Sequence, residues 1–110
     1  MRTFCGTYEY MSPELLQKKS YDYTVDIWGL GILLFELMHG HSPYRAKKIE
    51  DIYDNIVKRR MKCSSRVSAE VKDLLTKILK IKPSERLSLE GILKHPWVAR
   101  YSKLQRLKEL

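Results

Sequence analysis

The sequence predicts an all-α fold in which one central buried helix is surrounded by amphipathic helices. Three observations lead to this prediction. No segment alternates strictly between apolar and polar residues, the stretch from 25 to 38 is mostly apolar, and later segments carry apolar residues at helical spacing. With 110 residues, 44% of them hydrophobic and 31% charged, the chain has the composition of one globular domain with a single core.

The first helix is predicted over residues 13 to 18. Ser12 suits the N-cap, Pro13 suits the first helical position, and Glu14 lies where the helix dipole favours an anion. The segment before it, TFCGTYEYMSPE at 3 to 14, has the composition of a shaped loop that leads directly into a helix. Loops held in this way on a scaffold commonly present binding sites.

The central helix is predicted from about Thr24 to Met38, with Gly40 as a left-handed cap. Its apolar residues lie on all sides of a helical wheel, so we expect burial on every face. The glycines of GLGILL (29 to 34) then serve close helix packing rather than phosphate binding, because no strand precedes them. The stretch is too short, and with Asp26 and Glu36 too charged, to span a bilayer.

Three further helices follow the glycine cap. Ser68 is predicted to cap the second of them, which IKPSER (81 to 86) ends, and Ser88 begins a shorter helix that Pro96 ends. The tail after Trp97 is either a last half-exposed helix or frayed. The apolar stripes are Ile49, Ile52, Tyr53, Ile56 and Val57 for the helix from Ala46 to about Arg59, and Val71, Leu74, Leu75, Ile78 and Leu79 for the next.

The net charge of the chain bears on the classes of partner that it binds. The chain has 21 Lys and Arg against 13 Asp and Glu, a net charge of +8, but the basic residues are spread over several segments. A solvated basic surface is therefore favoured, and we expect neither nucleic acid nor membrane as a partner. The cluster KRRMK (58 to 62) either contacts phosphate or ends a helix that faces water.

Neither cysteines nor histidines form a metal-binding pattern. Cys5 and Cys63 lie far apart, and His39 and His41 have no third ligand nearby in sequence. We expect no metal site and no disulfide framework. A reducing intracellular compartment, cytoplasm or nucleus, fits this cysteine usage best.

Three motifs occur in a fixed order: TFCGTYEYMSPE, DIWGLG at 26 to 31, and PSERLSLEGILKHPW at 83 to 97. Together they resemble the C-terminal part of a eukaryotic Ser/Thr protein kinase domain, from the activation loop to the end of the large lobe. The A-P-E element of kinases corresponds to Ser12-Pro13-Glu14. The opening RTFCGT, the segment ELMHGHSPYRA (36 to 46) and the HPW ending are most similar to Aurora kinases and their basophilic relatives.

The resemblance implies a partial kinase large lobe over residues 1–98, with the activation and P+1 loop at 1–14, and a C-terminal tail over 99–110. It implies that Thr3 is the activation-loop phosphosite, where phosphate would add about two negative charges. Phe4, Tyr8 and Met11 would line the pocket for the substrate residue after the phosphoacceptor. Thr7 would form a hydrogen bond near the catalytic base, and Glu36 would bind a substrate arginine. Tyr8 replaces the proline of the usual Gly-Thr-Pro-Glu, which changes the stiffness of this loop.

Other residues have structural roles by the same resemblance. Glu14 would pair with Arg86 and tie the substrate loop to the far end of the lobe. Asp26 would hold the backbone of the catalytic loop, with Trp28 and Gly31 packed beside it.

The chain contains no His-Arg-Asp, no Asp-Phe-Gly and no Val-Ala-Ile-Lys, and its only asparagine, Asn55, lies in a surface-helix pattern. The complete domain would use ATP and Mg²⁺ to phosphorylate protein Ser or Thr. Because the residues that bind these cofactors are not in this chain, we expect no catalytic residue here and no activity from the 110 residues alone. The expected partners are protein substrates, including those with basic residues before the phosphoacceptor, and the missing N-terminal part of the kinase domain.

Two other functions are compatible with the sequence. One is a non-catalytic protein-binding module derived from a kinase. The other is a basic helical nucleic-acid binder, which only the net charge favours.

Overall fold

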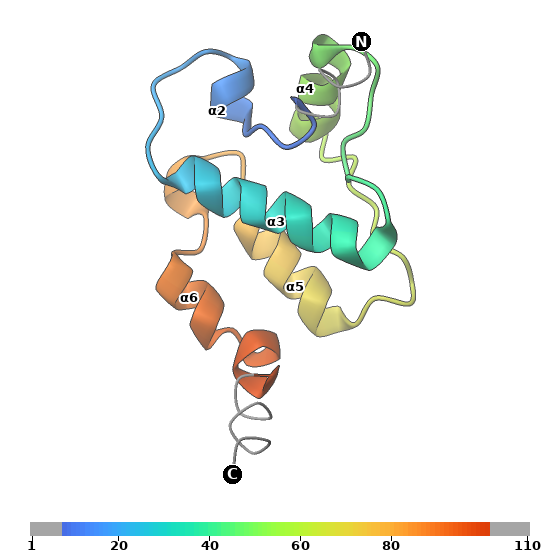
Figure 1. Ribbon diagram of the computed structural model, residues 1–110, viewed down its shortest axis with the longest axis vertical. Helices are drawn as coiled ribbons and strands as arrows, with labels where there is room; N and C mark the ends of the chain where they lie inside the picture. The colour runs from blue at the N-terminus through green and yellow to red at the C-terminus, as the bar shows by residue number, and fades with distance from the viewer. Residues whose placement is uncertain (1–7, 102–110) are drawn as a thin grey trace.

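A computed structural model describes residues 8–101 of the chain, and within this range it forms helices and no strand (Figure 1). The predicted all-α fold is confirmed. Helical backbone also covers residues 96 to 101, so Pro96 begins this last helical segment. The elements are α2 (Pro13–Leu16), α3 (Thr24–His39), α4 (Ile49–Val57), α5 (Ala69–Ile78), the short 3₁₀ helix η1 (Pro83–Glu85) and α6 (Leu89–Lys94).

The predicted helix ends rest on local capping contacts that the structure contains. The hydroxyl oxygens of Ser12, Ser68 and Ser88 accept hydrogen bonds from backbone N–H groups three residues later, at 3.4, 3.3 and 3.0 Å. Gly40 ends α3 with φ +80°, the left-handed conformation that glycine adopts without strain. Helix α2 ends two residues earlier than predicted, because Lys18 takes a positive φ of 57°.

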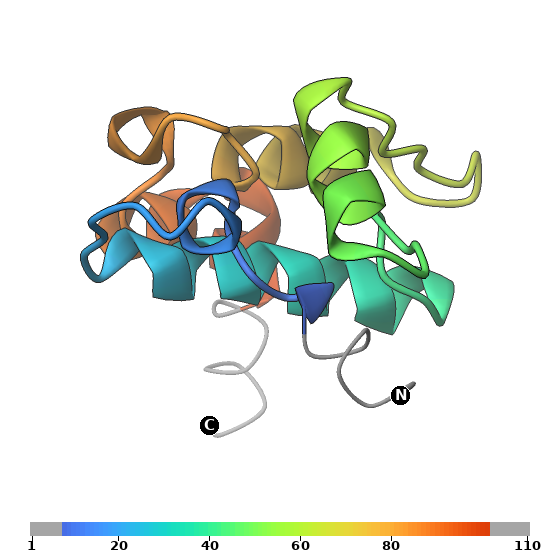
Figure 2. The same ribbon diagram turned by 90° about the horizontal axis from the view of Figure 1, so that it is seen from above.

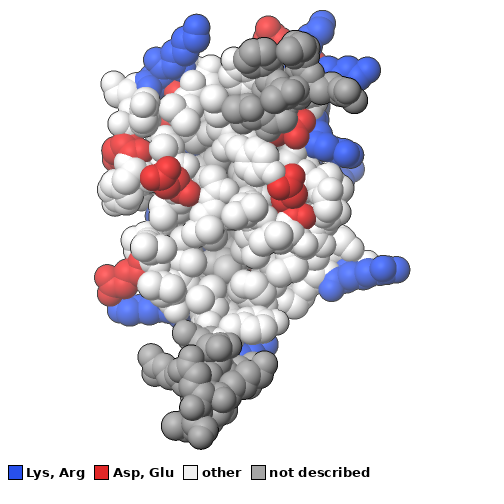
Figure 3. Space-filling view, viewed as in Figure 1, with Lys and Arg blue, Asp and Glu red and all other residues white. Residues whose placement is uncertain are grey.

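Helix α3 is the longest described element, and α4 and α5 lie on one side of it (Figure 2). Its covered face carries Ile27, Trp28, Gly31, Ile32 and Phe35. The expectation that α3 is buried on every face is wrong, because Leu30, Leu33, Leu37 and Met38 are 40%, 44%, 75% and 40% exposed. Apolar side chains favour burial, but a face of a helix is buried only where a neighbouring element covers it. The face of the molecule that carries α3 is largely uncharged (Figure 3).

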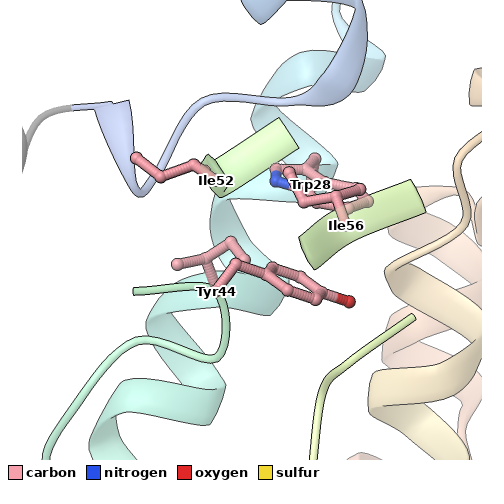
Figure 4. Close-up of a cluster of buried hydrophobic side chains, with 5 residues drawn as sticks. Trp28, Tyr44, Ile52 and Ile56 are labelled. Atoms are coloured by element: carbon pink, nitrogen blue, oxygen red, sulfur yellow. The ribbon is translucent and has the colours of Figure 1, made fainter. Parts of the chain in front are cut away.

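Three groups of side chains form the core. Trp28, Ile32, Tyr44, Ile52 and Ile56 join α3 to α4 (Figure 4), and the rings of Trp28 and Tyr44 stack with centroids 6.1 Å apart. A second group joins α3 to α5 and α6 through Ile27, Leu74, Ile78 and Ile92, and a third joins α3 to α5 through Phe35, Val71 and Leu75. The stripe predicted for residues 68 to 79 is thus the buried face of α5. Among the described residues, no helix is both long and apolar enough to cross a membrane.

The histidine of the HPW motif fastens α6 to α5. His95 is buried, and its Nε2–H donates to Asp73 Oδ2 at 2.8 Å while its Nδ1 accepts the Trp97 N–H at 3.2 Å. The hydrogen bond from His95, and then that from Lys77, hold the pKa of the Asp73 carboxyl below its usual value. The motif therefore has a structural role at the end of the described chain.

Close packing explains one of the two glycines in α3. A Cβ on Gly31 would lie 2.6 Å from Ile78 Cγ2 and 2.8 Å from Leu79 Cδ2, whereas a Cβ on Gly29 would have no atom within 4 Å. Both atoms belong to side chains at the α3–α5 contact. The prediction of close packing is therefore confirmed for Gly31 and does not hold for Gly29.

We expect Gly31→Ala to destabilise the fold by about 1–2 kcal/mol, because overpacking outweighs the gain of about 1 kcal/mol in helix propensity. Gly29→Ala is the matched control in the same helix, and it should stabilise the fold by up to about 1 kcal/mol. Urea unfolding of both variants measures the two free energies. Equal stability changes would contradict the packing assignment.

Candidate functional site

The described part of the N-terminal loop, residues 8–12, is held on the helical body by side-chain contacts. Tyr8 packs against the cluster around Trp28, and the Met11 N–H donates to the Tyr8 carbonyl at 3.1 Å. The buried Ser42 hydroxyl donates to Glu9 Oε1 at 2.8 Å, and the Tyr10 hydroxyl donates to Glu36 Oε1. This loop is therefore positioned by α3 and by the segment that follows it.

Helix α2 anchors the C-terminal end of the loop. Ser12 and Glu14 are 0% and 7% exposed, and Leu16 packs against the cluster around Trp28, so polar and apolar side chains both dock this short helix. The Glu14 carboxylate forms a two-fold hydrogen bond with Arg86, from guanidinium NH1 to Oε2 and from NH2 to Oε1, both at 2.8 Å. The predicted pairing of Glu14 with Arg86 is present in the structure.

Arg86 is fully satisfied in its buried position. Besides the two bonds to Glu14, Nε–H donates to the Lys80 carbonyl at 2.8 Å, NH1 to the Thr24 carbonyl at 3.0 Å and NH2 to the Ile81 carbonyl at 3.3 Å. These contacts use all five N–H donors of a guanidinium. The guanidinium carbon also lies 5.0 Å from the centroid of the Trp28 ring, a cation–π distance.

The environment of Glu14 favours its charged form. Burial alone would raise the pKa of the Glu14 carboxyl, but the hydrogen bonds and positive charge of Arg86 outweigh burial and hold the pKa below its ordinary value of 4.5. A lone buried carboxylate would show the opposite direction. The pair is therefore ionised at neutral pH.

The structure brings some of the predicted site residues together and leaves others apart. Tyr8, Met11 and Glu36 are half-buried, and Glu36 meets the loop through Tyr10. Asp26 is exposed at the start of α3, and no described residue bonds to its carboxylate. The predicted roles of Thr3, Phe4 and Thr7 concern positions outside the described residues.

Sequence reasoning missed three residues that fix the loop: Glu9, Tyr10 and Ser42. No spacing rule connects positions 10 and 36 or positions 9 and 42, because these contacts form only when the loop folds across α3. The one available signal was composition, since two tyrosines and a glutamate in five residues are unusual for a solvent-exposed loop.

The histidines and Cys63 serve the fold. His39 donates from Nδ1 to the Phe35 carbonyl at 3.0 Å and accepts the Ser64 N–H on Nε2 at 2.9 Å, so both ring nitrogens have partners. Cys63 is a free thiol, and burial raises its pKa. Within residues 8–101, no group of three or more His, Cys, Asp or Glu could hold a metal ion.

Removal of one partner from the Glu14–Arg86 pair should be costly. We expect Glu14→Gln to lower the free energy of unfolding by about 3–5 kcal/mol, because the Arg86 charge would stay buried without a counter-charge. The matched control is Glu90→Gln, which breaks an exposed pair with Lys94 whose side chains are 76% and 74% accessible. This control should change stability by about 0.5 kcal/mol or less in the same urea titration. A similar loss in both variants would disprove a special role for the buried pair.

The same pair should make stability depend on acid. Because the folded-state pKa of Glu14 is lowered, its contribution is complete above the ordinary value of 4.5 and is lost as pH falls through the lowered pKa. We expect the wild-type chain to lose more stability on acidification than Glu14→Gln does. Asp22 and Asp73, whose pKa values are also lowered, are common to both proteins and cancel in the comparison. Parallel curves of unfolding free energy against pH would show that Glu14 contributes nothing.

The comparisons with known proteins agree with this geometry. The family model described as the protein kinase domain matches residues 1–98. An Aurora kinase of Dictyostelium discoideum is 41% identical over 91% of this chain, and Aurora kinase C of Mus musculus is 41% identical over 93%. Aurora kinase A-A of Xenopus laevis is 38% identical over 97% of the chain.

The chain spans 26%, 37% and 26% of the lengths of these three relatives from Dictyostelium, mouse and Xenopus. The family match covers the loop at the N-terminus, the Glu14–Arg86 pair and every described helix up to residue 98. The chain belongs to the protein kinase family, and its all-helical fold is that of the C-terminal large lobe.

Proposed function

We propose that this chain is the substrate-recognition part of a Ser/Thr protein kinase, which transfers the γ-phosphoryl group of ATP, with Mg²⁺, to serine or threonine of proteins. The main support is the buried Glu14–Arg86 pair, which ties the loop before α2 to the body of the lobe. A peptide platform must be rigid, because catalysis of phosphoryl transfer depends mostly on positioning. The clamp supplies that rigidity at the C-terminal end of the loop.

Glu36 is the residue we propose for contact with a substrate arginine. Its carboxylate lies beside the loop, where Oε1 already accepts the Tyr10 hydroxyl. A neutral hydroxyl holds the carboxylate in place without cancelling its charge. The second oxygen can then accept from a guanidinium, which gives a charge-assisted hydrogen bond and selects basic peptides.

The roles of the remaining loop residues follow from the family. Tyr8 and Met11, together with Phe4, would form the pocket for the residue after the phosphoacceptor, and Thr7 would bond near the catalytic base. Phosphorylation of Thr3 would order the loop against basic residues. The half-burial of Tyr8 and Met11 supports a pocket wall in which part of each side chain stays accessible.

The ATP-binding and catalytic elements belong, in this proposal, to another part of the kinase domain. The exposed apolar face of α3, with Leu30, Leu33, Leu37 and Met38, is the surface against which that part would pack. The exposed carboxylate of Asp26, at the start of α3, would then hold the catalytic-loop backbone. ATP-dependent signalling of this kind would place the protein inside the cell, in cytoplasm or nucleus.

A second candidate is a non-catalytic protein-binding module. The same exposed face of α3 favours it, since exposed apolar patches commonly mark sites of protein association. The two candidates differ in what covers the face: the remainder of a kinase domain in the first, and a separate protein in the second. Only in the first candidate would the protein, once the exposed face of α3 is covered, transfer a phosphoryl group to a serine peptide.

The proposed function predicts the effect of Glu36→Gln on peptide binding. A fluorescent peptide with two arginines before its serine should bind the 110-residue chain about tenfold more weakly after this substitution, because a charged hydrogen bond is lost. Fluorescence anisotropy measures the two affinities. The same peptide with glutamines in place of the arginines should bind both proteins equally.

Glu90→Gln serves as the control variant, because it also removes one exposed carboxylate but lies on α6 away from the loop. Its affinity for the arginine peptide should match that of the wild type. If Glu36→Gln and Glu90→Gln weaken binding equally, general charge and not Glu36 attracts the peptide, and the assignment of Glu36 fails.

A further inference from the structure

A cleft separate from the N-terminal loop lies between the end of α4 and the end of α5. It has a volume of about 510 Å³, within the range of small-ligand and peptide-anchor sites. Trp28 and Tyr44 belong to its wall but are 0% and 4% exposed, so they support the cleft and are not available for contact. The accessible apolar lining comes from the half-buried side chains of Met61, Leu79 and Ile81.

The rim of this cleft is basic. Arg59 comes from the KRRMK cluster, and Lys80 and Lys82 come from the segment after α5. Glu85 is the one carboxylate among the described residues of the lining. The three cations form no ion pair with any described residue, so their charges are not neutralised by a direct contact. With three cations against one carboxylate, the described lining has a net charge of +2 beside an apolar surface.

Arg59, on the rim of the cleft, also has an unusual backbone conformation. Arg59 has φ 53°, in the left-handed region where glycine is the usual residue at a helix end. The Arg60 N–H donates to the Asn55 carbonyl and the Arg59 N–H to the Ile56 carbonyl, both at 3.0 Å, which is the hydrogen-bond pattern of a Schellman motif. Arg59 therefore occupies a backbone position that favours glycine, at the edge of the cleft.

The charge of Arg59 acts on the cleft wall. Burial raises the pKa of Tyr44 to about 12, and the positive charge of Arg59 opposes part of that rise. Both Arg59 and Tyr44 line the cleft, so the charge of Arg59 lies at the same surface as the buried ring.

We propose that this cleft binds an acidic segment of a partner protein, with one apolar side chain seated on Met61, Leu79 and Ile81 and flanking carboxylates at Arg59, Lys80 and Lys82. An apolar anchor between charged neighbours is a common mode of peptide recognition. The charge preference is opposite to the one proposed for Glu36, so this site stands independently of the substrate site.

Nucleic acid fits the cleft less well than a peptide does. Single strands bind by stacking bases on exposed aromatic rings along a continuous basic groove. Here the two aromatic side chains are buried, the accessible lining is aliphatic, and Glu85 interrupts the basic rim. An aliphatic surface bordered by cations suits a Phe or Leu side chain between Asp and Glu residues.

The test uses the 110-residue chain and a fluorescein-labelled peptide in which one phenylalanine is flanked on each side by two acidic residues. Arg59→Gly removes one rim charge and relieves the left-handed strain. We expect this variant to unfold at the same or a higher temperature and to bind the peptide about tenfold more weakly. Stability and binding should therefore change in different directions.

Lys18→Gly is a matched control. Lys18 also has a positive φ of 57° and the same hydrogen-bond pattern at the end of α2, with the Lys19 N–H on the Glu14 carbonyl at 2.9 Å, but it does not line the cleft. Its substitution removes the same charge and relieves the same strain. Lys18→Gly should leave the affinity for the acidic peptide unchanged. Lys82→Glu should lower this affinity more than Arg59→Gly does.

Three results would overturn the proposal. The first is equal loss of affinity in Lys18→Gly and Arg59→Gly, which would show that only net charge attracts the peptide. The second is undiminished binding when serine replaces the phenylalanine, since the apolar lining would then play no part. The third is tighter binding of a single-stranded oligonucleotide that Arg59→Gly abolishes, which would assign the cleft to nucleic acid.

Discussion

The pairing of Glu14 with Arg86 is the constraint on which the arrangement of the lobe depends. It joins residues 72 positions apart, and both side chains are almost completely removed from water. Such charges are tolerated only when every donor and acceptor is satisfied. The carbonyls of Thr24, Lys80 and Ile81 supply the remaining acceptors, so the start of α3 and the segment after α5 must also lie at fixed positions. One ion pair therefore sets the place of α2, and through α2 the place of the loop before it.

The buried ion pair is almost fully enclosed, whereas the apolar surface of α3 is only partly covered. The face of α3 that meets α4 and α5 is packed so closely that Gly31 leaves no room for a methyl group, whereas Leu33 and Leu37 on other sides are 44% and 75% exposed. A helix that is apolar all round is normally buried all round. Both faces are apolar and both tend to be buried. They differ only in that the described chain covers one of them and leaves the other exposed. This is why the same helix can order the loop and still present an apolar surface to another polypeptide.

Local chemistry in the sequence predicted the elements well, and long-range contacts poorly. Ser12, Ser68 and Ser88 cap helices because a hydroxyl three residues before a free N–H needs no distant partner, and the Val71 stripe packs because helical period alone places it on one face. Exposure of Leu37 could not be predicted, since periodicity reports hydrophobicity but not coverage. Within the candidate site, the Glu14–Arg86 contact came from a family resemblance and not from spacing. The Tyr10–Glu36 contact was missed because it depends on how a loop crosses α3.

Net charge proves to be the least informative property of the sequence. The net charge of +8, spread over several segments, suggested a solvated basic surface, yet the fold places acidic and basic side chains at different surfaces. Glu9 and Glu36 gather beside the N-terminal loop, while Arg59, Lys80 and Lys82 surround an aliphatic cleft that contains none of the loop residues. At about 0.1 M salt, charges interact over about 10 Å, so a ligand responds to the local group and not to the chain as a whole. The placement of individual side chains, and not the net charge, therefore decides which charges a ligand meets at each surface.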